Sequence, residues 1–204
     1  MPDIPEQTYL LGIVALAAYL LGSIPFGLLV ARMFGLGDVR QIGSGNIGAT
    51  NVLRTGNKSA AAATLVLDAL KGAVAVLIAK AAMGEAAAQV AGLAAFLGHC
   101  FPVWLRFKGG KGVATFIGVI YALSWPVGIA VSVTWIAVVA IFRWSSMGAL
   151  LAAGLAPVWA IILGYGAGVV LLMALCVLVY IRHSANISRL RVGTEPKIGK
   201  AKSG

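Results

Sequence analysis

Acidic side chains are scarce in this chain: six of its 204 residues are Asp or Glu, and they are scattered. No acidic cluster could hold a divalent metal ion, so metal-dependent phosphotransfer is not expected. Cys100 and Cys176 are the only cysteines, and both fall in apolar runs where a thiol behaves as a small hydrophobic group. The sequence therefore predicts no bound metal and no cofactor.

Several catalytic motifs are also missing. Leu105 and Gly112 stand where a nucleotide P-loop around Lys111 would need Gly and Ser or Thr. The sequence holds no G-x-S-x-G nucleophile motif. Neither His99 nor His183 is followed by Asp at the spacing of an H-x-x-x-x-D acyltransferase motif. Nucleotide hydrolysis and covalent catalysis by a serine are therefore not expected.

Apolar residues dominate instead, since 60% of the chain is hydrophobic and only 11% is charged. This composition predicts an integral membrane protein. The apolar runs do not alternate as barrel strands do, so we expect an all-α bundle. Residues 1–204 are expected to form a single polytopic membrane domain. The net charge of +10 lies in short loops and the tail, with no aromatic-rich soluble module, so nucleic acid is not an expected partner.

Seven transmembrane helices are predicted. They are expected at Thr8–Phe34 with a kink at Pro25, Ser59–Ala81, Gln89–Leu105, Val113–Leu123, Val127–Phe142, Met147–Leu163 and Gly166–Ile181. With the N-terminus outside, every Lys and Arg except Lys71 and Lys80 lies at the cytoplasmic face, including Lys200 and Lys202 in the tail. The positive-inside rule thus favours an outside N-terminus and a cytoplasmic C-terminus.

The polar loop Gln41–Arg54 lies between two of these apolar runs. We expect its glycines, at 43, 45 and 48, to allow tight turns and to expose backbone N–H groups. Its candidate phosphate-binding residues are Ser44, Gly45, Asn46, Thr50, Asn51 and Arg54. A flexible linker with one topogenic arginine is the alternative interpretation.

A second loop, Phe107–Thr115, reads FKGGKGVAT and leads into a predicted helix whose first N–H groups favour anions. Its candidate phosphate-binding residues are Lys108, Gly110, Lys111 and Thr115. A basic turn that only fixes topology is the alternative.

A third polar loop is predicted at Arg143–Ser146, and a basic tail begins at Arg182. If the last helix continues through this tail, His183 and Asn186 share one face, because residues three apart are neighbours on a helix. The alternative is a basic juxtamembrane helix that binds anionic lipid.

Two ionisable residues lie inside the second predicted helix. Asp68 and Lys71 are three residues apart, which permits an ion pair at a depth where single charges are costly. We interpret them as support for the site rather than as groups that contact substrate. His99 is either a base or a hydrogen-bond donor in helix packing, and packing is favoured because a lone histidine is more often structural, so it is counted with these supporting residues.

Several ordered motifs give the chain a family resemblance. They are GSIPFG at 22–27, SGNIGATNVLR at 44–54, DALKG at 68–72, GHCFPVWLRFKGGKGVAT at 98–115, and RHSANISRL with GTEPK at 182–197. With these motifs the chain resembles the bacterial acyl-phosphate:glycerol-3-phosphate acyltransferases of the inner membrane. The resemblance covers almost the whole chain.

The resemblance implies acyl transfer from acyl phosphate to the sn-1 hydroxyl of glycerol 3-phosphate, without coenzyme A, acyl carrier protein or metal. The residues that it implies for the polar site are Ser44, Asn46, Arg54, Lys111, His183, Asn186 and either Ser145 or Ser146, of which Ser146 is favoured. Lys111 and His183 are the catalytic candidates, although we expect no essential general base, since a substrate phosphate can accept the hydroxyl proton.

A transporter or channel for phosphorylated metabolites is the alternative of a different class. It would use the same basic loops but would need a polar path to the outer side. The chain offers little there beyond Lys80 and Glu85.

Overall fold

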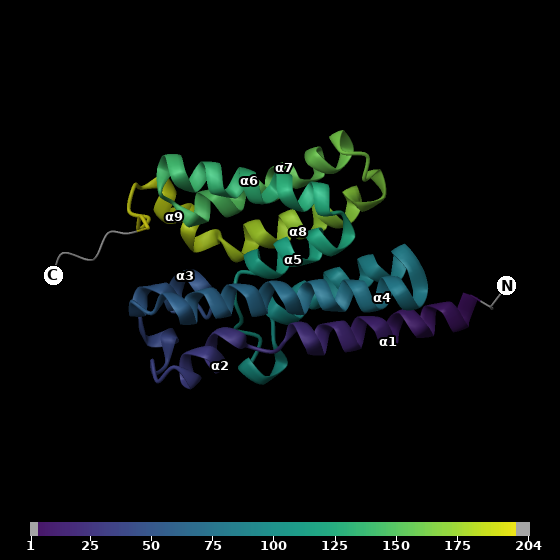
Figure 1. Cartoon of the computed structure of the whole chain (residues 1–204), viewed down its shortest axis with the longest axis horizontal. Coiled ribbons are helices and arrows are strands. Elements are labelled where there is room, and N and C mark those ends of the chain that lie inside the picture. The colour runs from purple at the N-terminus through teal and green to yellow at the C-terminus, as the bar shows by residue number, and fades with distance from the viewer. Residues whose placement is uncertain (1–3, 199–204) are drawn as a thin grey trace. The chain divides into compact units, whose positions relative to one another are not determined.

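The computed structural model describes residues 4–198, and it describes side chains from Gln7 onward. The chain divides into two compact units, residues 1–123 and 124–204, and each is described by itself. The first unit contains α1 (Ile4–Gly22), α2 (Phe26–Met33), α3 (Ala49–Val52), α4 (Lys58–Cys100) and α5 (Val113–Leu123). The second contains α6 (Trp125–Phe142), α7 (Ser145–Ile162), α8 (Val169–Arg182) and α9 (Ser184–Arg191) (Figure 1). Residues 4–198 contain no strand, so the expected all-α class is confirmed for them.

The predicted kink at Pro25 is a complete break between α1 and α2. A break inside an apolar segment leaves carbonyl groups without helical partners. The Ser23 carbonyl accepts a hydrogen bond from Trp104 Nε1 at 2.7 Å, and the Ile24 carbonyl accepts one from Lys71 Nζ at 2.8 Å. Two distant side chains therefore satisfy the backbone that the proline disrupts.

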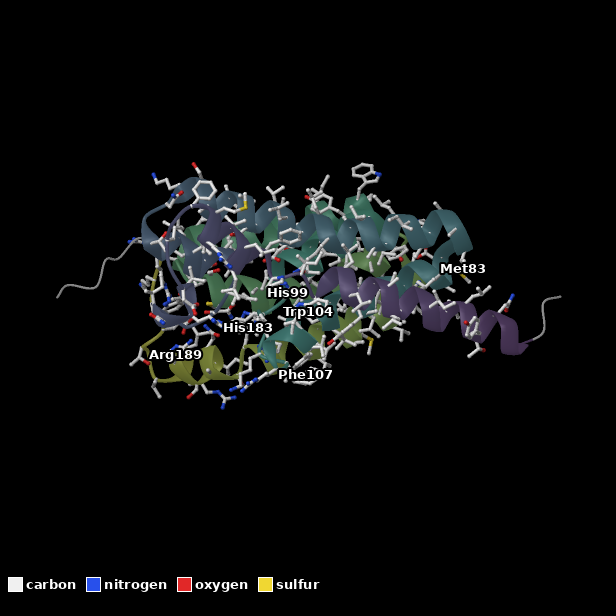
Figure 2. All side chains as sticks on the ribbon, turned by 90° about the horizontal axis from the view of Figure 1, so that it is seen from below. Met83, His99, Trp104, Phe107, His183 and Arg189 are labelled. Carbon is white, nitrogen blue, oxygen red and sulfur yellow. The ribbon has the colours of Figure 1, made fainter. Side chains whose placement is uncertain are left out.

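Helix α4 reverses direction at Gly84, where φ is 80° and ψ is −163°. In a straight helix Asp68 and His99 would lie about 46 Å apart at 1.5 Å per residue. Their Oδ1 and Nδ1 atoms are instead 3.5 Å apart. The two predicted helices and the turn between them are thus confirmed, and Figure 2 shows Met83 at the turn, far from His99.

The second arm of α4 is shorter than predicted, because it ends at Cys100 and not at Leu105. Pro102 explains the difference, since the residue before a proline is disfavoured in helical conformation. Residues Val103–Leu105 form a separate 3-10 turn. The predicted bounds of the following helix, Val113–Leu123, agree with α5.

Small residues let the helices of the first unit approach closely. A Cβ atom placed on Gly22 would lie 2.1 Å from the Ala95 carbonyl oxygen, and one on Gly118 would lie 2.0 Å from the Ala69 carbonyl oxygen. Figure 1 shows α1 running alongside α4, where a cluster of buried alanines fills the contact. Close approach through small residues is typical of helices that pack within a membrane.

In the second unit α6, α7 and α8 pack in sequence. Arg143 ends α6 in the left-handed conformation with φ at 65°. The predicted loop Arg143–Ser146 is wrong in its second half, because Ser145 and Ser146 form the first turn of α7. The last helix does not continue straight through His183, since α8 and α9 are bent by 64° relative to each other there.

Four helical segments of the described chain are long and apolar enough to cross a membrane, or five when α8 and α9 are taken as one bent span. These segments treat α1 with α2, and both arms of α4, as single units. Helix α5 is apolar but shorter. Seven spans, and the sides on which the termini lie, therefore stay predictions.

Candidate functional site

Asn51 organises the polar loop of the first unit. Its Oδ1 atom accepts hydrogen bonds from Ser44 N at 3.0 Å, Ser44 Oγ at 3.3 Å and Arg54 Nη1 at 3.4 Å. Its Nδ2 atom donates to the Val39 carbonyl at 2.7 Å. Asn51 itself is buried, whereas Ser44 and Arg54 are exposed. One buried amide thus holds an exposed hydroxyl and an exposed guanidinium together.

The glycines of this loop differ from the expectation. Gly43 and Gly45 have positive φ, so the predicted tight turns are present. However, Gly45 N–H donates to the Ile42 carbonyl, and Gly48 N–H donates to Asn46 Oδ1. The prediction that these two glycines expose their N–H groups is therefore wrong, because the loop uses them to hold its own shape.

Close approach explains why residue 43 is a glycine. A Cβ atom at that position would lie 2.5 Å from Asn51 Oδ1 and 2.6 Å from both Cδ and Nη1 of Arg54. The φ of 56° would also strain any other residue. Thr50, another predicted residue, is exposed in the first turn of α3.

The second loop is docked on the end of α4. Gly109 N–H donates to the Cys100 carbonyl and Gly110 N–H donates to the His99 carbonyl, each at 3.1 Å. These bonds satisfy carbonyl groups that the helix end leaves open. They also use the N–H groups of Gly109 and Gly110, so the positive charge of this loop comes from the side chains of Lys108, which is exposed, and Lys111, which is half-buried.

Thr115 was predicted to bind phosphate, but its side chain is not accessible from the loop surface. It is fully buried, and its hydroxyl donates to the Asp68 carbonyl at 2.9 Å. The structure therefore places Thr115 in the contact between α4 and α5.

The three ionisable residues that were interpreted as supporting groups form one buried cluster. Lys71 Nζ lies 2.8 Å from Asp68 Oδ1, which confirms the expected ion pair. His99 Nδ1 faces the same oxygen at 3.5 Å. Asp68, Lys71 and His99 are 2%, 3% and 4% exposed. Figure 2 shows His99 in the interior and Phe107, from the neighbouring loop, projecting outward.

Glu195 organises the polar residues of the second unit. Its carboxylate accepts hydrogen bonds from Ser146 Oγ at 2.7 Å, Asn186 Nδ2 at 2.5 Å and Arg189 Nε at 2.6 Å. Ser146 and Asn186, both predicted as substrate-binding residues, are thus brought together by a residue that the sequence analysis did not select. The sequence did contain a feature that could have identified Glu195: it is one of only six carboxylates in the chain and lies in the GTEPK motif.

The charge state of Glu195 follows from these donors. Burial raises the pKa of its carboxyl group, but the hydrogen bonds from Ser146, Asn186 and Arg189 outweigh burial and lower the pKa below its ordinary value of 4.5. Glu195 is therefore ionised at neutral pH. Its side chain is only 7% exposed, so it presents little charge to solvent.

The segment around Glu195 is fastened to the turn between α6 and α7. Ile198 N–H donates to the Arg143 carbonyl at 2.8 Å, and an Arg143 guanidinium N–H donates to the Ile198 carbonyl at 2.9 Å. Trp144 Nε1 donates to the Glu195 carbonyl at 3.1 Å. Lys197 Nζ lies 5.1 Å from the centre of the Trp144 ring. These contacts close the segment over the N-terminal end of α7.

His183 occupies the bend between α8 and α9 and is buried. Its Nδ1 atom lies 2.8 Å from the Val179 carbonyl oxygen. Because a carbonyl only accepts, Nδ1 carries the proton in this contact and Nε2 is the acceptor edge of the neutral ring. The structure thus fixes the ring orientation of this catalytic candidate.

Every carboxylate whose side chain is described pairs with a cation. The pairs are Asp38 with Arg40, Asp68 with Lys71, Glu85 with Lys80 and Glu195 with Arg189. The Arg40 hydrogen bonds lower the pKa of Asp38 to about 2. Within the described residues, no three His, Cys, Asp or Glu side chains are placed to share a metal ion. Lys200, Lys202 and Asp3 lie outside the described residues.

Comparisons with known proteins agree on one family. A family model described as glycerol-3-phosphate acyltransferase matches residues 12–193. A glycerol-3-phosphate acyltransferase of Jannaschia sp. is 62% identical over 98% of both chains, and one of Dinoroseobacter shibae is 60% identical over 99% of this chain and 100% of the relative. Both relatives therefore match over nearly their full length.

Two solved structures of PlsY, an integral membrane glycerol 3-phosphate acyltransferase, are also similar. The glycerol 3-phosphate form has a TM-score of 0.87 and 38% identity, covering 93% of this chain and 96% of that one. The lysophosphatidic acid form has a TM-score of 0.86 and 36% identity, covering 93% and 95%. On this evidence the chain belongs to the glycerol-3-phosphate acyltransferase family.

Proposed function

We propose that the protein transfers a fatty acyl group from an acyl phosphate to the sn-1 hydroxyl of glycerol 3-phosphate. The products are 1-acyl-glycerol 3-phosphate and inorganic phosphate. The observation that carries this proposal is the 38% identity, over 93% of the chain, to a PlsY structure in its glycerol 3-phosphate form. The lysophosphatidic acid form of PlsY supports the nature of the product.

The polar loops of the first unit suit a phosphate-rich reaction. Arg54, Lys108 and Lys111 would hold the two substrate phosphates, which repel each other, while Ser44 and Asn46 would add neutral hydrogen bonds. Asn51 supports this assignment, since it holds Ser44 and Arg54 in fixed positions. In this proposal Asn51 and Thr115 position the loops rather than contact substrate.

The chemistry needs no covalent enzyme intermediate, because an acyl phosphate already carries a good leaving group. The sn-1 oxygen attacks the acyl carbon, a carbon–oxygen bond forms, and the bond to phosphate breaks with its electron pair leaving on phosphate. A phosphate oxygen of a bound substrate accepts the hydroxyl proton. Lys111 and Arg54 would stabilise charge that develops on the phosphates.

Polar residues of the second unit are proposed to take part in the same reaction. His183 would orient substrate through Nε2, since Nδ1 contacts the Val179 carbonyl. Ser146 and Asn186 are hydrogen-bonded to Glu195, and these bonds would hold the two side chains in place for substrate.

The proposed setting is the inner membrane of a bacterium, with seven spans, the N-terminus outside and the polar loops facing the cytoplasm. Counting α1 with α2 as one span, α4 as two, and α5 to α8 as one each gives this number. Lys80 and Glu85 form an ion pair at the α4 turn, with Nζ and Oε2 3.3 Å apart, and Lys80 also donates to the Leu123 carbonyl. Because these two charges are already paired, they offer little to a polar transport path, which favours an enzyme over a transporter.

The donor is tested by acyl transfer with purified protein. Palmitoyl phosphate and palmitoyl-CoA would be supplied in turn with labelled glycerol 3-phosphate, and the position of the acyl group in the product would be determined. We expect transfer from palmitoyl phosphate to the sn-1 position without coenzyme A or acyl carrier protein. Equal turnover of palmitoyl phosphate and palmitoyl-CoA would refute this proposal.

A further inference from the structure

The loop that carries Lys108 and Lys111 packs on the buried cluster of Asp68, Lys71 and His99, which it contacts through His99. The N–H groups of Gly109 and Gly110 bond to the end of α4, and the acceptor for Gly110 is the carbonyl of His99 itself. The imidazole of the same residue contacts the loop backbone. A Cβ atom placed on Gly110 would lie 2.1 Å from His99 Nε2, and its three nearest neighbours would all be atoms of this ring.

The opposite edge of the ring faces a fixed charge. His99 Nδ1 lies 3.5 Å from Asp68 Oδ1, and that oxygen lies 2.8 Å from Lys71 Nζ, which also donates to the Ile24 carbonyl. A carboxylate attracts a proton on the nitrogen that faces it, so Asp68 favours a proton on Nδ1. The ring therefore presents Nε2 to the loop in one orientation.

Asp68 contacts the far side of the loop by a second route. Its carbonyl accepts a hydrogen bond at 2.9 Å from the hydroxyl of Thr115, the last residue of the loop, which lies in the first turn of α5. The side chain of Asp68 thus acts on Gly110 through His99, and its backbone acts on the end of the loop through Thr115. Buried, close-packed groups transmit small displacements, so a shift at either contact moves Lys111, which lies between Gly110 and Thr115, and Lys108, which lies two residues before Gly110.

We propose that Asp68 and His99 are positioning residues, which set the conformation of Lys108–Gly112 and thereby place Lys108 and Lys111 for phosphate binding. This inference rests on the proposed function, because it assigns these lysines to substrate phosphate. Neither Asp68 nor His99 touches substrate in it. The effect is expected mainly in glycerol 3-phosphate affinity, because these variants displace the lysines without removing the charge that Lys111 supplies in the transition state.

The test is a double-mutant cycle of His99→Asn and Gly110→Ala. His99→Asn keeps a donor toward Asp68 but removes the ring edge that contacts Gly110. Gly110→Ala pushes a methyl group into that edge. Each single variant should weaken glycerol 3-phosphate affinity, measured by calorimetry without donor, about tenfold, and should raise KM about as much while kcat changes less than about threefold.

The double variant distinguishes positioning from general damage. Removing the ring makes room for the added methyl group, so its affinity should match that of a single variant instead of falling by the product of the two effects. Gly12→Ala is the matched control, since its added Cβ meets nothing within 4 Å, and it should leave affinity unchanged. If His99→Asn is not monodisperse, Asp68→Asn is used in its place. Asp68→Asn should likewise weaken glycerol 3-phosphate affinity and raise KM more than it changes kcat.

Unchanged affinity in a monodisperse His99→Asn or Asp68→Asn variant, or effects that multiply in the double variant, would overturn the inference. Calorimetry does not depend on turnover. Absence of acyl transfer by the unaltered protein would therefore refute the proposed function alone.

Discussion

The substitution Glu195→Gln should weaken the docking of the segment around residue 195, which three hydrogen bonds to the Glu195 carboxylate hold in place. In Glu195→Gln one of the two carboxylate oxygens becomes an NH2 group, so at least one of Ser146, Asn186 and Arg189 faces a donor instead of an acceptor. The remaining bonds lose their charge assistance. A charge-assisted hydrogen bond contributes about 1.5–3 kcal/mol and a neutral one about 1, so docking of the segment around residue 195 should weaken by about 2–4 kcal/mol.

Hydrogen exchange at the Ile198 amide measures this docking, because its N–H donates to the Arg143 carbonyl across the closed segment. If local opening governs exchange, 2–4 kcal/mol corresponds to roughly 10²-fold faster exchange in Glu195→Gln. Glu85→Gln is the control, since Glu85 pairs with Lys80 at the α4 turn and its loss should leave Ile198 unaffected. Equal Ile198 exchange in Glu195→Gln and the unaltered protein would refute this reasoning.

Acid should release the same segment. The pKa of Glu195 lies below 4.5 in the folded protein because its hydrogen bonds outweigh burial. A lowered pKa contributes stability that is fully present above the unfolded value and is lost as pH falls through the folded value. Protection of Ile198 should therefore persist at neutral pH and down to about 4.5, and decline below it.

The remaining predictions concern the reaction. Lys111→Ala and Arg54→Ala should each reduce acyl transfer about 10²-fold or more without loss of folding, as expected for removal of one charge-stabilising donor. Near-normal kinetics in either monodisperse variant would remove that residue from the reaction. His183→Gln should retain appreciable activity with a similar pH profile, whereas His183→Ala should lose more, because Gln keeps a neutral donor and acceptor. If both variants are equally inactive and the wild-type rate follows an ionisation absent from the substrates, His183 is the general base.

The sequence alone determined the features that depend on local chemistry. The position of Pro25 predicted the interruption between α1 and α2, since proline acts through its own backbone. The spacing of Asp68 and Lys71 fixed their ion pair, because residues three apart on a helix are neighbours. The bounds of α5 followed from the polar residues on either side of a short apolar run.

Only the tertiary structure decided which polar groups are already engaged. Composition favoured exposed N–H groups at Gly45 and Gly48, but each donates within its own loop. Glu195 reaches Ser146 across 49 residues, and His99 reaches Asp68 across the reversal of α4. Such partners are chosen by the path of the chain through space, because a hydrogen bond depends on distance and angle and carries no fixed sequence spacing outside a helix or turn.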